Sequence, residues 1–72
     1  MSAAAQVEAL AADVRSRRRA LGLGQQDLAD LSGASVRFVR NLEHGKPSVR
    51  LDKLLAVLDV LGLELRAGVR GR

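Results

Sequence analysis

Residues 25–45 read QQDLADLSGASVRFVRNLEHG. The second half of this stretch places Val39 and Leu42 three residues apart, so both fall on one face of a helix. Gly33 separates them from an earlier apolar pair, Leu28-Ala29, and a residue without a Cβ atom can end a helix in the left-handed conformation. The stretch therefore predicts two short helices joined by a tight turn.

The second of these helices has a defined start and two different faces. Ser35 is a good N-cap because its hydroxyl can accept a hydrogen bond from a free amide one turn later, which places the two helices at about 25–31 and 35–43. The face opposite the apolar residues carries Val36, Arg37, Arg40 and Asn41. Two helices in this arrangement form a helix-turn-helix, whose second helix can enter the major groove of DNA.

The size and composition of the chain predict a single domain, residues 1–72, that associates with a second copy. A chain of 72 residues buries only about 60% of the surface that its unfolded form exposes, so its core is small. Disulfides, metals and oligomers are the usual supports for such domains. Because the chain has no cysteine and one histidine, we expect a homodimer and no metal or cofactor. We also expect no enzyme, since the chain has no catalytic set of side chains and too few residues to enclose a pocket.

The expected location is the cytoplasm, in association with the nucleoid. No apolar run approaches the ~20 residues that cross a bilayer. The first residues, MSAAAQVEALAADV, contain acidic side chains and no basic start, unlike a signal peptide. We therefore expect no membrane partner.

The basic residues agree with a DNA partner but do not select it by themselves. Twelve Lys and Arg against eight Asp and Glu give a net charge of +4, and a membrane surface or an acidic partner would suit such a charge equally well. The arrangement of the two helices favours DNA. The basic residues gather in two clusters, Arg15, Arg17, Arg18 and Arg19 in the first and Arg37, Arg40 and Lys46 in the second.

An amphipathic helix is predicted before the motif, from about Gln6 to Leu21. Its apolar residues recur at intervals of three, four and seven: Val7, Leu10, Val14 and Leu21. Position 18 completes the same stripe with an arginine. We expect residues 1–5 to be frayed. Gly22-Leu23-Gly24 ends this helix and opens the next.

A fourth helix and a strand are predicted after the motif. The helix extends from about Arg50 to Leu61 and ends at Gly62, so the helical core covers residues 6–61. Residues 63–69 then alternate apolar and polar side chains at the period of a strand. A lone strand leaves its backbone unpaired, so we expect it to pair with the same segment of a second copy. Residues 70–72 form a basic tail, and the apolar residues of the dimerising strand are Leu63, Leu65, Ala67 and Val69.

The motif residues resemble a known family, the Xre and Cro type helix-turn-helix repressors, over about residues 14–61. This resemblance implies an all-α, lambda-repressor-like bundle of four to five helices, to which the chain adds its C-terminal strand. With that strand, the chain resembles HipB-type antitoxins. These are small dimeric repressors whose strands pair between subunits and which bind a kinase-like toxin. The matching positions are Gln25, Leu28-Ala29, Gly33, Ser35, Val39, Leu42-Glu43 and Gly45.

The resemblance implies which side chains hold the phosphates. Gln25 matches the glutamine that binds a phosphate through its side chain and the helix amides, at a helix end that favours anions. His44 and Lys46 match positions that contact the DNA backbone. Gly24 departs from the family, which usually has Thr, Ser or Asn there as a further phosphate ligand.

Base contacts are expected from the exposed face of the second motif helix. Arg37 can donate two hydrogen bonds to a guanine or, alternatively, bind a phosphate, and Asn41 can pair with an adenine. Val36 lies where the family often has glutamine, and it can only press on a thymine methyl. Phe38 either packs at the edge of the core or contacts a thymine methyl or a sugar. The expected DNA-binding residues are Gln25, Ser35, Val36, Arg37, Arg40, Asn41, His44 and Lys46.

Arg18 and Glu43 are expected to form a structural ion pair. Arg18 lies on the buried stripe of the first helix, and Glu43 follows a buried residue at the end of the second motif helix. An unpaired buried charge is expensive, so the two should pair, as the matching Arg and Glu of the family do.

Together these features predict a homodimeric repressor of transcription that binds a palindromic operator with half-sites ~34 Å apart. The resemblance extends this to the antitoxin of a type II toxin-antitoxin operon, which represses its own promoter and neutralises a HipA-like kinase toxin. The alternatives are a stand-alone Xre-family regulator without a toxin and a helix-turn-helix adaptor for protein interactions. Val36 and Gly24 favour the adaptor, whereas Arg37, Arg40 and Lys46 argue against it.

Overall fold

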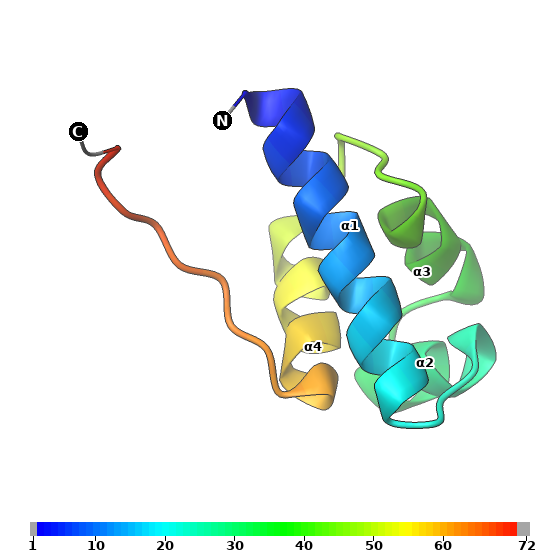
Figure 1. Cartoon of the computed structure of the whole chain (residues 1–72). Helices are drawn as coiled ribbons and strands as arrows, with labels where there is room; N and C mark the ends of the chain where they lie inside the picture. Colours follow the sequence, from blue (N-terminus) through cyan, green and yellow to red (C-terminus); the bar gives the residue numbers. More distant parts are fainter. Residues whose placement is uncertain (1, 71–72) are drawn as a thin grey trace.

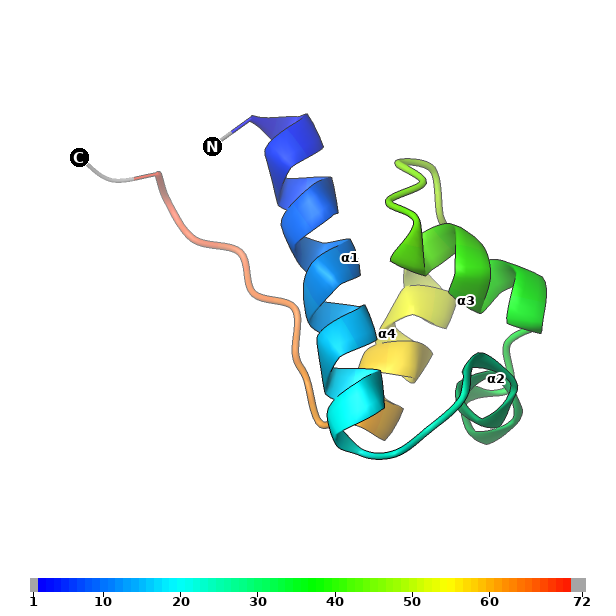
Figure 2. The ribbon, with the colours of Figure 1, turned by 45° about the vertical axis from the view of Figure 1, so that its right-hand side comes forward.

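The computed structural model describes residues 2–70, which contain four helices and no strand, so the all-α part of the prediction is confirmed (Figure 1). The helices are α1 (Ala3–Ala20), α2 (Gln25–Ser32), α3 (Val36–Glu43) and α4 (Leu51–Leu61). Figure 2 shows α2 and α3 on the side of the bundle away from the C-terminal segment. α2 packs against α3 and α4, and α1 packs against α3 and α4.

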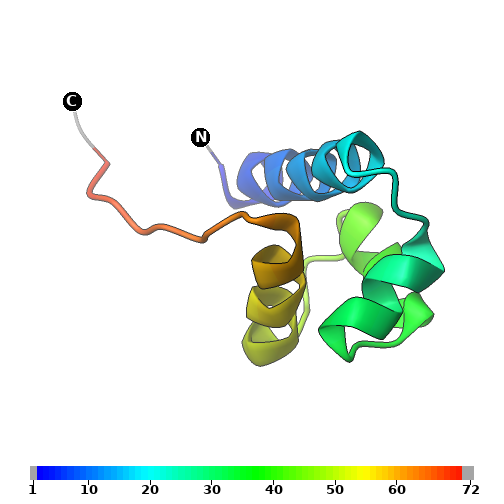
Figure 3. The ribbon, with the colours of Figure 1, turned by 90° about the horizontal axis from the view of Figure 1, so that it is seen from below.

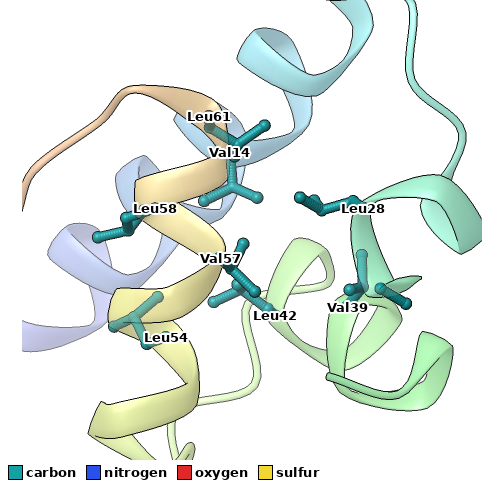
Figure 4. Close-up of a cluster of buried hydrophobic side chains, with 9 residues drawn as sticks. Val14, Leu28, Val39, Leu42, Leu54, Val57, Leu58 and Leu61 are labelled. Atoms are coloured by element: carbon teal, nitrogen blue, oxygen red, sulfur yellow. The ribbon is translucent and has the colours of Figure 1, made fainter. Parts of the chain in front are cut away.

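Each helix contributes apolar side chains to one core (Figure 4). The predicted stripe residue Val14 of α1 is fully buried, as is Val39 of α3. Leu21, the last residue of the predicted stripe, follows the end of α1 at Ala20 and is 44% exposed. Burial of each large aliphatic side chain contributes about 1.5–3 kcal/mol, which makes this core the main stabilising element. The fully buried large side chains are Val14, Leu28, Val39, Val57, Leu58 and Leu61.

Glycine ends each helix at the positions that the sequence indicates. Gly33 and Gly45 have φ angles of 75° and 78°, a left-handed conformation that other residues adopt only with strain. After α3, the Gly45 N–H donates to the Leu42 carbonyl at 3.1 Å and the Lys46 N–H donates to the Asn41 carbonyl at 3.0 Å. This pair of bonds is a Schellman motif, which satisfies carbonyls that the helix itself leaves free.

The start of α1 differs from the expectation that residues 1–5 are frayed. Residues 3–5 form its first turn because Ser2 acts as N-cap, and its hydroxyl accepts a hydrogen bond from the Ala5 N–H at 3.1 Å. Met1 lies outside the described residues.

The strand predicted over residues 63–69 is not formed. Leu63 completes the end of α4 instead, because its N–H donates to the Leu58 carbonyl at 2.9 Å and its side chain packs against the core. Residues 64–69 make no backbone hydrogen bond within the part of the chain that the structure describes, since a strand needs a neighbour. This segment extends away from the helices with Leu65 and Val69 exposed (Figure 3). Of the predicted basic tail, Arg70 is exposed and residues 71–72 lie outside the described range.

Candidate nucleic-acid interface

α3 is held as the second helix of a helix-turn-helix and presents a cationic face. The Ser35 hydroxyl caps it by accepting a hydrogen bond from the Phe38 N–H at 3.0 Å. Val39 and Leu42 are buried on its inner face, whereas Arg37 and Arg40 are exposed. A short helix buried on one face and cationic on the other can approach a groove of DNA without disturbing the core.

The remaining expected DNA contacts divide into exposed and partly covered residues. His44 and Lys46 are exposed in the segment that follows α3, and Asn41 is half-buried. Val36 is also half-buried and packs against the core, which leaves less of its side chain to reach a thymine methyl. Phe38 packs against the core as well, in agreement with its structural interpretation.

The structure brings Arg18 and Glu43 together in a buried, bidentate ion pair. Arg18 Nε lies 2.6 Å from Glu43 Oε2 and Arg18 Nη2 lies 2.9 Å from Glu43 Oε1. The Arg18 Nη1 group donates to the Leu23 carbonyl at 2.8 Å, and the two side chains are only 9% and 2% exposed. The pair thus joins α1 and the end of α3 to the turn before α2.

The surroundings shift the pKa of both partners toward the charged forms. Burial acts to raise the pKa of Glu43, but hydrogen bonds from Arg18 and Gln25 and the charges of Arg18 and Arg15 outweigh it, so this pKa is lowered. The hydrogen bond to Glu43 raises the pKa of Arg18, despite its burial. Both residues are therefore charged at neutral pH.

Three of the four arginines of the first basic cluster donate hydrogen bonds within the fold: Arg15, Arg17 and Arg18. Arg15 Nη1 donates to the backbone carbonyl of Glu43 at 2.6 Å, and Arg17 Nε donates to the carbonyl of Leu61 at 2.8 Å. These carbonyls lie at the ends of α3 and α4, where helices carry free acceptors and a negative dipole end. Sequence clustering does not reveal such acceptors, because they lie far along the chain.

The N-terminus of α2 already holds protein groups at the expected phosphate site. The Gln25 side-chain nitrogen donates to Glu43 Oε1 at 3.2 Å, and its oxygen accepts a hydrogen bond from Arg40 Nε at 3.4 Å. The Gly24 N–H donates to Asp27 Oδ2 at 2.7 Å. Asp27 thus makes the half of a capping box that the N3 side chain makes, whereas Gly24 has no side chain to bond the helix amides in return. Asp27 also places a negative charge at the N-terminus of α2, the expected phosphate site.

Residues 2–70 contain no group of three or more His, Cys, Asp or Glu side chains placed to hold a metal ion. No helix in this part of the chain is long and apolar enough to cross a membrane.

Comparison with known proteins agrees with this geometry. A family model described as helix-turn-helix matches residues 14–67, which include α2, α3 and α4. The chain is similar to an uncharacterised HTH-type transcriptional regulator of Sinorhizobium fredii, with 40% identity over 52 residues. The aligned region covers 72% of this chain and 68% of that protein.

Proposed function

The chain belongs to the Xre-type helix-turn-helix family of DNA-binding transcriptional regulators, and from this premise we propose that it is a homodimeric repressor of a palindromic operator. The observation that carries the proposal is the double character of α3. Its inner face is fixed by Val39, Leu42 and the Arg18–Glu43 pair, while Arg37 and Arg40 are exposed on its outer face.

In this proposal, the exposed side chains of α3 and of the following turn have different tasks. Arg37 donates two hydrogen bonds to a guanine edge, because a planar guanidinium matches the acceptors N7 and O6. Lys46 and His44 bind phosphates, which position the protein without selecting a sequence. Gln25 adds a phosphate contact at the start of α2.

The C-terminal segment supplies the dimer contact in the same proposal. Residues 64–69 are extended, their backbone groups have no partner in the described chain, and Leu65 and Val69 are exposed. Pairing with the same segment of a second copy satisfies these groups and covers the two apolar side chains. A two-fold axis then spaces the half-sites of the operator by ~34 Å.

We further propose an antitoxin role, in which the dimer represses its own promoter and neutralises a HipA-like kinase toxin. Its support is the resemblance to HipB-type antitoxins in size and in the extended C-terminal segment. This role predicts co-purification with a kinase-like protein encoded beside the gene. A stand-alone Xre-family regulator, located with the nucleoid in the cytoplasm, would purify without such a protein.

A protein-interaction adaptor is the second candidate function. It is favoured by the half-burial of Val36 and by Asp27 at the N-terminus of α2, since both weaken expected DNA contacts. The exposed Arg37, Arg40 and Lys46 favour DNA instead.

Selection of DNA from a pool of random duplexes tests the repressor against the adaptor. We expect the wild-type protein to enrich one palindromic sequence, and its affinity to fall with salt by a logarithmic slope of about 0.9 per phosphate contacted. A double variant, Arg37→Ala with Arg40→Ala, should remain folded by circular dichroism and lose the enrichment. A wild-type protein that enriches no sequence, or binds independently of salt, would contradict the repressor.

A further inference from the structure

Gln25 connects the buried ion pair to an exposed arginine of α3. Its side-chain nitrogen donates to Glu43 Oε1 at 3.2 Å, and its oxygen accepts from Arg40 Nε at 3.4 Å. Glu43 is itself fixed by two hydrogen bonds from Arg18. Three successive links therefore lead from the side chain of Arg18 in the core to that of Arg40 on the surface.

The hydrogen bonds that link Arg18 to Arg40 through Glu43 and Gln25 leave other N–H donors of Arg40 and Gln25 available for DNA. An arginine has five N–H donors, and Gln25 engages only the one on Nε, so the two terminal nitrogens of Arg40 remain for DNA. The Gln25 amide nitrogen carries two hydrogens, and Glu43 needs one of them. Gln25 can therefore hold Arg40 and bind a phosphate at the same time.

Arg37 provides the contrast on the same helix. It is exposed like Arg40, but it makes no hydrogen bond or ion pair within residues 2–70. A free arginine loses its rotamer freedom when it binds DNA, whereas one already held in place loses less. Arg40 thus differs from Arg37 in being oriented before DNA arrives.

We propose that Gln25 is a positioning residue, which orients the guanidinium of Arg40 for its contact with DNA through the anchor that Glu43 and Arg18 provide. This inference rests on the proposed DNA-binding function. It deepens that function by making the contact of Arg40 depend on a residue of α2. Under this proposal Gln25 contributes to DNA binding through Arg40, and not only through a phosphate contact of its own.

A double-mutant cycle tests the dependence, with the duplex that the wild-type protein selects from a random pool as the probe. Gln25→Met keeps the length of the side chain and removes both hydrogen bonds. In the wild-type and Arg37→Ala backgrounds we expect it to weaken binding by about two- to tenfold. In the Arg40→Ala background the same substitution should have a clearly smaller effect. An equal effect in all three backgrounds would overturn the proposal and leave Gln25 as a phosphate ligand only.

A second measurement needs no DNA and separates this inference from the proposed function. In the free protein, NMR relaxation of the arginine Nε–H groups should show Arg40 more restricted than Arg37, and Gln25→Met should remove the difference. Equal mobility of Arg40 and Arg37 in the wild-type protein would overturn the positioning role. If the wild-type protein selects no duplex, the DNA-binding proposal fails, while this measurement still decides whether Gln25 orients Arg40.

Discussion

Arg18 donates to both carboxylate oxygens of Glu43 and to the carbonyl of Leu23, whereas Arg19, the next residue, is exposed. The same side-chain chemistry thus supports the fold at one position and is solvated at the next. Burial decides the difference, because a charge removed from water must keep its partner.

Removal of Arg18 should therefore destabilise the protein strongly. Arg18→Met leaves the Glu43 carboxylate buried without its partner, which costs about 3–5 kcal/mol. A domain of this size has a total stability of a similar magnitude, so the variant should be largely unfolded. Urea unfolding followed by circular dichroism measures the change. Arg19→Met is the matched control and should stay within about 0.5 kcal/mol of the wild type; similar losses for both variants would contradict the role of the pair.

The pH dependence of stability should reveal the contribution of the Arg18–Glu43 pair. Because the pKa of Glu43 is lowered in the folded state, its contribution is fully present above the unfolded pKa of about 4.3 and is lost as the pH falls through the folded value. Urea unfolding between neutral and acidic pH should show this loss in the wild type and a flatter profile in Glu43→Gln.

Asp52→Asn serves as the control for that profile. The pKa of Asp52 is also lowered, by its hydrogen bond from Arg50, but both side chains are exposed and water screens their interaction. The substitution should leave the acid profile close to that of the wild type. A Glu43→Gln profile as steep as that of the wild type would contradict the assignment.

Arg37 and Lys46 should have different effects on DNA binding. Arg37→Ala should relax the preference for one base pair, because it removes the proposed contact to a base edge. Lys46→Ala should weaken all sequences alike and lower the salt slope by about one, because it removes one proposed phosphate contact. Binding to the selected duplex and to single-base variants of it, over a range of salt, measures both. A uniform loss with Arg37→Ala would place Arg37 on a phosphate.

Helix ends are the point at which elements are joined, and glycine sets their geometry. Gly33 ends α2 with a φ of 75°, and a Cβ added there would meet no atom within 4 Å. The turn between the two motif helices is therefore limited by backbone conformation and not by space.

Gly33→Ala should lower stability through this conformational strain alone. A residue with a Cβ in the left-handed region costs about 1–2 kcal/mol. Thermal unfolding measures the loss, and Gly68→Ala, in the extended C-terminal segment with open space around it, should have almost no effect. If Gly33→Ala were as stable as the wild type, the turn would have to tolerate a different backbone conformation.

At the scale of the whole molecule, the C-terminal segment leaves apolar side chains uncovered. Leu65 is 48% exposed and Val69 is 98% exposed, and the segment extends outward from the bundle (Figure 1). Leu51 and Leu55 of α4 are also exposed, at 58% and 42%, and form the alternative surface for association.

Charged substitutions should show which surface holds the proposed dimer. Leu65→Glu combined with Val69→Glu should release monomer in analytical ultracentrifugation, because two carboxylates per chain would enter a paired apolar strand. Leu51→Glu, which changes a comparably exposed leucine of α4, should leave the dimer intact. The opposite pattern would move the interface to α4.

Local pattern alone was enough to place the four helices and several core residues. The spacing of Val39 and Leu42, the cap at Ser35 and the stop at Gly33 act over a few residues, so they are visible in the sequence. The pairing of Arg18 with Glu43 was also accessible, since a charge on a buried stripe needs a partner.

Only the tertiary structure decided which acceptors the other polar side chains find. Arg15 reaches a carbonyl 28 positions away and Arg17 one 44 positions away, and Gln25 lies between Glu43 and Arg40. Periodicity carries no information about such contacts, because they depend on how the helices pack. The same reason explains the C-terminal segment, where an alternating pattern is necessary for a strand but a neighbouring strand must complete it.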